Sequence, residues 1–265
     1  MSDTPIDVFI DLPSFPGPVQ AGRLWSHFRK GRESASFEYN KEWLANPHRF
    51  ALEPLLPLTD GTFHTNPGQS VFGAIGDSTP DRWGRILMRR AELARARTAN
   101  ESPHTLSELD YLLRVNDEAR QGALRFSQDG GQSFCAPPGS TPIPPLVNLS
   151  RLLHAADHFC RDDENAEDLR LLLAPGSSLG GARPKASVKD KKGNLCIAKF
   201  PRYDDEYNVV AWEAVALTLA SKAGLQVPRF EQEKITDKDV LIVWRFDRTR
   251  EQRRISYLSA MSMLG

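Results

Sequence analysis

The pattern of hydrophobic and polar positions changes near the middle of the chain. In the first half, short alternating stretches typical of strands are mixed with stretches in which apolar residues recur at helical spacing. Strands are predicted at 8–10, 36–39 and 122–126, and helices at 81–97 and 106–115. This half therefore predicts a small region of mixed α/β structure.

The second half begins with two predicted helices and continues with a strand-rich pattern. Helices are expected at 146–159, 164–173 and 208–223, and strands around 186–188 and at 195–200, 230–235 and 240–246. Gly224 directly follows the last of these helices and suits the left-handed conformation that commonly ends helices. The apolar run Val240–Trp244 is typical of a strand buried on both faces. Two strands are therefore expected on each side of one helix.

A stretch rich in proline and glycine separates the two halves. Phe134–Pro145 reads F-C-A-P-P-G-S-T-P-I-P-P, a composition unsuited to a helix or a central strand. We interpret 134–145 as a linker between one region of residues 1–133 and another of residues 146–265. Linkers of this kind are preferred sites of proteolysis, so cleavage is predicted there.

Composition narrows the class of protein. The 265 residues contain 34 Lys and Arg against 34 Asp and Glu, so the formal net charge is zero, which disfavours a broadly cationic nucleic-acid binder. The three cysteines are scattered without metal-site or disulfide spacing. The acidic amino terminus does not resemble an export signal, and no apolar run approaches the ~18 residues that span a bilayer. We therefore expect a cytoplasmic protein that has no membrane partner.

A glycine-rich loop is the first candidate for chemistry. The segment Gly176–Val188 reads G-S-S-L-G-G-A-R-P-K-A-S-V, and backbone N–H groups in such a turn can bind an anion, to which Lys185 adds positive charge. The segment matches neither G-x-x-x-x-G-K-[ST] nor G-x-G-x-x-G. An ordinary hairpin loop explains the same residues equally well.

Two charged residues stand on otherwise apolar elements. Alternation places Lys199 on the same face as Leu195 and Ile197, so an ammonium group is expected on an apolar face, unless the lysine lies at the strand edge and reaches water. Glu213 is surrounded in sequence by valines, leucines and a tryptophan, where a carboxylate is best tolerated beside a cation. We predict that Lys199 and Glu213 form an ion pair that lines a cleft, as the strand lysine and helix glutamate of kinases do.

The residues after the last predicted strand are a third candidate. Trp244–Arg248 reads W-R-F-D-R, and in a kinase lobe this position is the hinge whose backbone binds adenine. Phe246 would then lie in the hinge and Asp247 would face the ribose. The alternative is local: Asp247 pairs with a neighbouring arginine in an exposed turn, which contributes about 0–1 kcal/mol.

Together these motifs closely resemble the HipA family of bacterial serine/threonine kinases, the toxins of type II toxin–antitoxin systems. The second half carries the motifs at 178–185, 197–201, 213, 223–228 and 245–248, and the first half matches at 37–39, 55–58, 80–84 and 121–126. The resemblance implies an α+β protein: a small mixed α/β amino-terminal subdomain followed by the N-lobe of a protein-kinase-like (PI3/4-kinase-like) fold.

The resemblance also implies roles for individual residues. Lys199 matches the lysine that binds the ATP phosphates, with Glu213 as its partner, and both are expected to be catalytic. The other nucleotide-binding positions are Gly180, Gly181 and Lys185 in the phosphate-side loop and Phe246 and Asp247 at the hinge. No residue is expected to be a metal ligand.

Two further positions bear on regulation and on specificity. Ser178 matches the loop serine that the family autophosphorylates, a modification that ejects the loop and switches the kinase off. Trp244 departs from the family pattern, in which this position is usually acidic. Because hinge contacts are mostly made by the backbone, adenine binding is expected to survive this change.

The implied function is that of an ATP-dependent protein kinase with Mg²⁺ as cofactor. In the family the substrates include aminoacyl-tRNA synthetases, whose phosphorylation arrests translation. The implied partners are an intracellular protein substrate and a HipB-like, DNA-binding antitoxin, through which the family reaches DNA. Direct DNA binding by this chain is disfavoured by its zero net charge and by the lack of a recognisable reader motif.

The sequence also suggests what this chain does not supply. Kinases carry the catalytic Asp and the metal-binding Asn and Asp well beyond the hinge, and this sequence stops at Gly265. We therefore expect an amino-terminal portion of such a kinase, inactive on its own. The alternative is a non-catalytic, truncated HipA-like module that only binds a HipB-like antitoxin.

Overall fold

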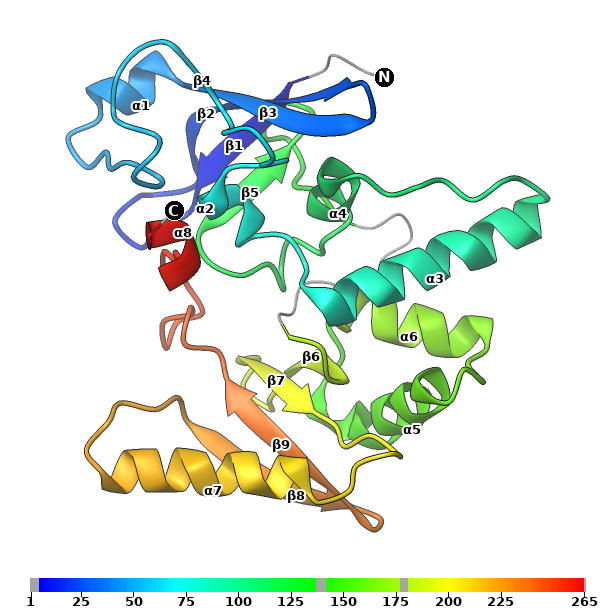
Figure 1. Ribbon diagram of the computed structural model, residues 1–265. Coiled ribbons are helices and arrows are strands. Elements are labelled where there is room, and N and C mark those ends of the chain that lie inside the picture. The colour runs from blue at the N-terminus through cyan, green and yellow to red at the C-terminus, as the bar shows by residue number, and fades with distance from the viewer. Residues whose placement is uncertain (1–4, 137–141, 177–180, 265) are drawn as a thin grey trace. The chain divides into compact units, whose positions relative to one another are not determined.

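The computed structural model describes residues 5–136, 142–176 and 181–264 and is shown in Figure 1. It contains two compact units. The first comprises Met1–Thr79, Thr105–Pro138 and Arg253–Gly265, and the second comprises Pro80–His104 and Gly139–Gln252.

The first unit is built on a five-stranded antiparallel sheet in the order β4-β3-β2-β1-β5. Its strands are β1 (Ile6–Ile10), β2 (Val19–Arg29), β3 (Arg32–Tyr39), β4 (Thr62–His64) and β5 (Leu124–Ser127). Lys30 and Gly31 join β2 to β3 and both have positive φ (50° and 75°). A two-residue turn of this kind matches the twist of paired strands and so fixes the register of the longest hairpin.

Short helices and a large aromatic core complete the first unit. The helices are α1 (Lys41–Ala45), α2 (Gly73–Gly76), α4 (Glu108–Leu113) and α8 (Ala260–Leu264). Phe37, Trp43 and Phe126 are fully buried against the apolar face of the sheet. Ser107 and Asp110 form a capping box at the start of α4, which satisfies backbone donors that the helix itself cannot pair.

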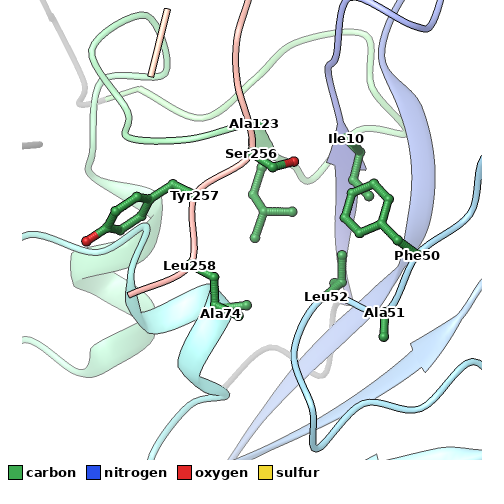
Figure 2. Close-up of a pocket in the computed structure, with 10 residues that line it drawn as sticks. Ile10, Phe50, Ala51, Leu52, Ala74, Ala123, Ser256, Tyr257 and Leu258 are labelled. Carbon is green, nitrogen blue, oxygen red and sulfur yellow. The ribbon is translucent and has the colours of Figure 1, made fainter. Parts of the chain in front are cut away.

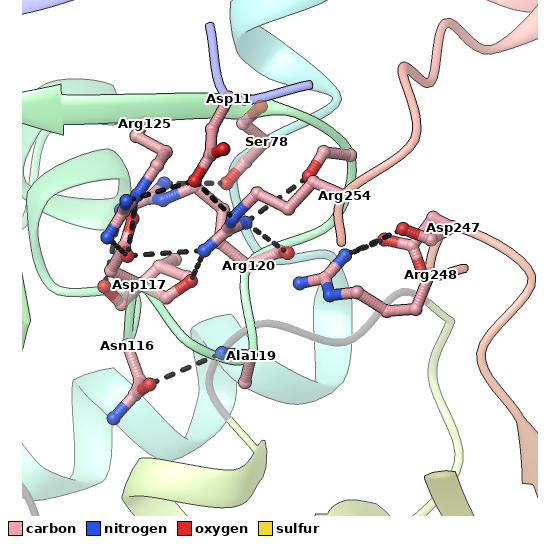
Figure 3. Close-up of polar contacts among 12 residues, drawn as sticks. Asp11, Ser78, Asn116, Asp117, Ala119, Arg120, Arg125, Asp247, Arg248 and Arg254 are labelled. Atoms are coloured by element: carbon pink, nitrogen blue, oxygen red, sulfur yellow. Dashed lines mark hydrogen bonds and ion pairs between the residues drawn. The ribbon is translucent and has the colours of Figure 1, made fainter. Parts of the chain in front are cut away.

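Buried charges in the first unit are matched to internal partners (Figure 3). Arg125 donates from Nε and Nη2 to one carboxylate oxygen of Asp117 (3.0 and 2.6 Å). Arg254 donates to the backbone carbonyls of Arg120 and Gly122 (3.2 Å each) and also reaches Asp117. Since the Arg254 side chain is only 8% exposed, these contacts tie the segment after residue 252 into the first unit.

The second unit is built on a four-stranded antiparallel sheet in the order β6-β7-β9-β8. Its strands are β6 (Lys185–Lys189), β7 (Leu195–Lys199), β8 (Phe230–Ile235) and β9 (Lys238–Trp244), and its helices are α3 (Arg82–Ala99), η1 (Leu146–Asn148), α5 (Leu149–Cys160), α6 (Ala166–Gly176) and α7 (Val209–Lys222). Among the described residues, no helix is both long and apolar enough to cross a membrane.

The two faces of this sheet are covered by different helices. On one face, Ala198 and Ile242 pack in a core with residues of α3, α5 and α6. On the other face, Val210 and Ala214 of α7 pack on Leu241 of β9. Figure 1 shows α7 running alongside β8 and β9. β9 is therefore apolar on both faces, as its continuous apolar run predicted.

Most of the predicted elements are present. The helix predicted at 208–223 is α7, and Gly224 after it has φ +81° as expected. The strand predicted at 240–246 ends earlier, at Trp244. Four elements were not predicted, namely β2, β4, α1 and α2. The mixed α/β character is confirmed, with two antiparallel sheets.

The division into residues 1–133, 134–145 and 146–265 stays a prediction. The two compact units divide the chain at other positions than this prediction. Helix α3 lies within residues 1–133, but it contributes Trp83 and Leu87 to the core of the second unit. Backbone hydrogen bonds hold both ends of the predicted linker. The backbone N–H of Cys135 donates to the carbonyl of Phe126 (2.9 Å), and the backbone N–H of Lys189 donates to the carbonyl of Pro144 (2.9 Å). Residues 137–141 lie outside the described residues.

Candidate functional site

Strand register places two of the predicted lysines side by side. In the β6–β7 pair, Lys185 lies directly opposite Lys199, and Ser187 lies opposite Ile197. In the β7–β9 pair, Lys199 lies opposite Leu241, which packs against α7. Both lysines therefore lie on the α7 face of the sheet, and helix α7 packs on its β8–β9 part.

Lys199 shares its face with Leu195 and Ile197 as predicted, but the main core lies on the opposite face. Cys196 and Ala198, the alternate residues of β7, are fully buried in that core. Ile197 is only half-buried, and the Lys199 side chain is 29% exposed. Both faces of β7 carry apolar residues, so alternation alone did not show which face the larger group of helices covers.

The predicted ion pair is confirmed. The Lys199 ammonium group donates to Oε1 of Glu213. Asn208 caps α7 by accepting from the N–H of Ala211 (3.0 Å), and helix packing through Ala214 places the neighbouring Glu213 toward β7. With the Glu213 side chain 38% exposed, the pair contributes about 0–1 kcal/mol to stability. The prediction that it lines a cleft stays a prediction.

Lys185 is a buried lysine whose surroundings disfavour its charged form. The residue is only 7% exposed. Burial, followed by the like charge of Lys199, lowers the pKa of Lys185 to about 8. Gly181 has φ +80°, and a Cβ built there would lie 3.0 Å from the Lys185 Nζ, so glycine permits the loop backbone to approach the ammonium group. Gly180 and Ser178 of the same loop lie outside the described residues.

The first turn of α3 contacts the same loop. Asp81 caps α3, and its Oδ2 accepts a hydrogen bond from the N–H of Gly181 (2.6 Å). Trp83 donates from its backbone to the Gly181 carbonyl (3.0 Å) and from its indole to the Lys185 carbonyl (2.8 Å). Sequence reasoning singled out P-D-R-W-G only as part of a resemblance. An aspartate before a helix predicts a cap, but nothing local predicts a partner 100 residues away.

The turn after β9 is held by a buried charge cluster. Arg245 donates two hydrogen bonds of 2.6 Å to Asp247, one to each carboxylate oxygen, and Arg248 donates to the same group (2.8 Å), as Figure 3 shows. The local pairing expected as an alternative is present, but Asp247 is 0% exposed rather than in an exposed turn. Its carboxylate points inward, so it acts on the turn that presents Phe246.

Trp244, which departs from the family pattern, has partners of its own. Its indole N–H donates to Asp190 (3.1 Å) in the β6–β7 connection. The guanidinium group of Arg229 lies 3.9 Å from the centre of the Trp244 ring, a cation–π contact. The tryptophan therefore joins the end of β9 to neighbouring segments.

The lysine face of the sheet also carries a buried hydroxyl group, that of Ser187. Ser187 lies on the lysine face and is 1% exposed, and its Oγ has no hydrogen-bond partner within the described residues. Across the part of the chain that the structure describes, no group of three or more His, Cys, Asp or Glu side chains is placed to hold a metal ion.

A separate pocket of about 250 Å³ lies in the first unit (Figure 2). Phe50 and Leu52 line one side, and Tyr257 and Leu258 of the segment after residue 252 line another. None of its lining residues is charged, so it offers no cation to a phosphate. None of the predicted site residues lies there.

Comparison with known proteins identifies two family models along the chain. The model described as HipA N-terminal domain matches residues 17–127, and the model described as HipA-like C-terminal domain matches residues 177–265. No match was found among curated proteins.

Among solved structures, the fold is similar to HipA from Shewanella oneidensis MR-1, in a complex of the toxin–antitoxin proteins HipA and HipB with operator DNA. The TM-score is 0.50 at 18% sequence identity, and the match covers 96% of this chain. It covers 54% of the solved chain, so the present chain spans about half the length of that relative. At this identity the likeness concerns the fold.

Proposed function

The chain belongs to the HipA-like toxin family, and from that premise we propose that its second unit binds ATP, with Mg²⁺, for a protein serine/threonine kinase. The observation that carries the proposal is the pair of lysines opposite each other on β6 and β7, beside Glu213. This is the combination of loop, strand lysine and helix glutamate that positions ATP phosphates in kinases.

The local charges favour a polyanionic ligand. Burial first, and then repulsion by the neighbouring ammonium group of Lys199, lower the pKa of Lys185, so its charged form is disfavoured in the folded chain. A polyphosphate beside both groups would offset this repulsion. The backbone at Gly181 lies close to the Lys185 ammonium group. Because glycine has no side chain, this backbone could also approach a bound phosphate closely.

Each residue has a defined task in this proposal. Lys199 would bind the phosphates. Its ion pair with Glu213 adds little to the stability of the fold, so the proposed task of Glu213 is to orient the Lys199 ammonium group. The backbone at Phe246 would bind adenine, and Asp247 would fix the turn through its two arginines. Mg²⁺ would enter with ATP and neutralise charge that develops on the transferred phosphoryl group.

Phosphoryl transfer would use a carboxy-terminal lobe together with this chain. The chain spans about half of the solved HipA, and the catalytic and metal-binding residues of kinases follow the hinge at a distance. The proposed acceptor is an intracellular protein such as an aminoacyl-tRNA synthetase, so that transfer arrests growth. Ser178 is the proposed autophosphorylation site that switches the kinase off.

The proposed partner is a HipB-like antitoxin. The solved relative was determined with HipB and operator DNA, and the present chain has zero net charge. A chain without excess positive charge gains little from phosphate contacts along DNA. We therefore propose that it reaches DNA only through the antitoxin.

Radiolabelled ATP with Mg²⁺ tests the kinase proposal. The 265-residue chain alone is expected to incorporate no phosphate at Ser178. Adding the carboxy-terminal lobe of a HipA relative, as a fusion or as a second chain, should restore transfer. Lys199→Ala should then lower the rate by about 100-fold or more, because a cation that stabilises phosphoryl charge is lost. Lys222→Ala, an exposed lysine on α7, should change little.

The outcomes separate the two candidate functions. Label on Ser178 in the chain alone, absent from Lys199→Ala, would show that this chain is catalytically complete. A fusion that folds and binds a HipB-like antitoxin but transfers nothing would favour the non-catalytic module. Transfer that is unaffected by Lys199→Ala would contradict the assigned site.

A further inference from the structure

We propose that Asp81, at the start of α3, is a positioning residue that holds the loop at Gly181 and thereby sets the position of Lys185. The inference rests on the proposed nucleotide site for its functional meaning, whereas the contact itself is independent of any ligand. It links the P-D-R-W-G motif, residues 80–84, to a loop that follows it by about 100 residues.

The Asp81 carboxylate divides its two oxygens between two tasks. Oδ1 accepts from the N–H of Arg82 (2.7 Å), at the start of α3. Oδ2 accepts from the N–H of Gly181 (2.6 Å). The hydrogen bond from Gly181, helped by the bond from Arg82, lowers the pKa of Asp81 although burial acts in the opposite direction. The group is therefore ionised at neutral pH and both bonds are charge-assisted.

Trp83 holds the same segment at two further points. Its backbone N–H donates to the Gly181 carbonyl and its indole N–H donates to the Lys185 carbonyl. The ring is 3% exposed and packs edge-on against Phe159 of α5, with ring centres 5.1 Å apart. Both ends of the segment 181–185 are therefore attached to the first turn of one helix.

This attachment acts on the lysine in two ways. It fixes the backbone at Lys185, the residue that lies opposite Lys199. It also places the negative charge of Asp81 where it raises the pKa of Lys185, against the lowering by burial and by Lys199. The first turn of α3 thus influences both the place and the protonation of the cation proposed to bind phosphate.

Asp81→Ser separates this role from simple helix capping. Serine is as good a cap as aspartate, but its single short hydroxyl cannot serve both N–H groups. Amide hydrogen exchange read by NMR at Gly181 should accelerate by about tenfold or more, since a hydrogen bond to a charged group is lost. The amides of α3 and the melting temperature should stay near wild type. Asp163→Ser, an exposed aspartate of the same unit, is the matched control.

A second variant covers the case in which Asp81→Ser loosens α3. Asp81→Asn keeps the size of the side chain but has only one acceptor oxygen, so it can satisfy one of the two N–H groups. With the Arg82 bond kept, exchange at Gly181 should rise while α3 stays protected. In both variants the pKa of Lys185, followed through ¹³C-labelled lysine, should fall below its wild-type value. Loss of a helix cap alone would not cause that shift.

Exchange and ATP titration answer different questions. Unchanged exchange at Gly181 in both variants would overturn the inference, whatever the chain binds. Faster exchange, together with ATP binding weakened about tenfold, would support it together with the proposed site. If wild-type chain binds no ATP, the proposed function fails, and the exchange at Gly181 still decides whether Asp81 holds the loop.

Discussion

The cluster around Asp117 in the first unit and the lysine face of the second unit differ in how their buried charges are arranged. In the first unit, Arg125 and Arg254 both donate hydrogen bonds to the carboxylate of Asp117, and Arg254 also donates to backbone carbonyl groups. In the second unit, two lysines lie opposite each other on adjacent strands and the pKa of Lys185 falls to about 8. In the first arrangement each cation faces acceptors, whereas in the second a buried ammonium group lies beside that of Lys199, which is paired with Glu213.

The difference separates a structural role from a binding role. A buried charge that is fully matched within the fold fixes one packing arrangement, and removing one partner leaves the other costly. Like charges that perturb each other on one face of a sheet mark a candidate site for a ligand of opposite sign. Substitutions in the first unit should therefore change stability, whereas substitutions at the lysine face should change ligand affinity.

The largest expected effect is on stability, in the first unit. Arg254→Ala removes hydrogen bonds to the carbonyls of Arg120 and Gly122 and leaves Asp117 with less compensation. The expected loss is about 3–5 kcal/mol of the free energy of unfolding. Urea denaturation measures it, with Arg250→Ala, an exposed arginine, as control. A loss below that of the control would show that the network is not structural.

The next effect sharpens the lysine side of the comparison. Gly181→Ala introduces a Cβ 3.0 Å from the Lys185 Nζ at a residue with φ +80°, and should weaken ATP binding by about tenfold through displacement of the cation. Gly193→Ala, in the β6–β7 turn with φ +83° and no atom within 4 Å of a Cβ, carries the same backbone strain. Titration calorimetry on both variants separates strain from displacement. Equal loss of affinity in the two would refute the assignment.

A smaller effect is expected from pH. ATP affinity should decline by several-fold as pH rises through about 8, the pKa of Lys185, because the protonated form of this lysine is the one proposed to bind phosphate. Over this range the phosphates of ATP stay ionised, since the second pKa of a phosphoryl group lies near ~6. Lys185→Arg keeps its charge and should flatten the profile. A wild-type profile as flat as that of the arginine variant would contradict the role of Lys185.

The same lysine predicts the opposite trend for stability of the unliganded chain. Its pKa is about 8 when folded against 10.5 as the ordinary value. Between these values the unfolded chain binds more protons, so this group makes the free energy of unfolding rise with pH across that window. Lys185→Met should lack this contribution, which urea denaturation at a series of pH values measures.

Local signals carried much of the fold. The strand at 230–235 and helix α7 with its cap and Gly224 follow from periodicity and from residues within a few positions. β2 was not predicted because polar and apolar residues mix along Val19–Arg29, where only some positions are buried. α1 and α2 are too short for a helical period to emerge.

The site was predictable where charge stood out against an apolar background. Lys199 and Glu213 were found this way, and they do pair. The hold of Asp81 on Gly181 depends on tertiary packing and has no local signature. The inward orientation of Asp247 likewise depends on two arginines whose partner choice the sequence left open.

The most direct test of the central claim is a calorimetric titration of the full chain with ATP·Mg²⁺ and, separately, with adenosine. If the face shared by Lys185 and Lys199 binds the phosphates, ATP should bind at least about tenfold more tightly than adenosine, since ion-assisted hydrogen bonds contribute ~1.5–3 kcal/mol each. Lys185→Met and Lys199→Met should each remove most of that difference and leave adenosine binding unchanged. ATP binding of wild-type strength in both variants would contradict the account.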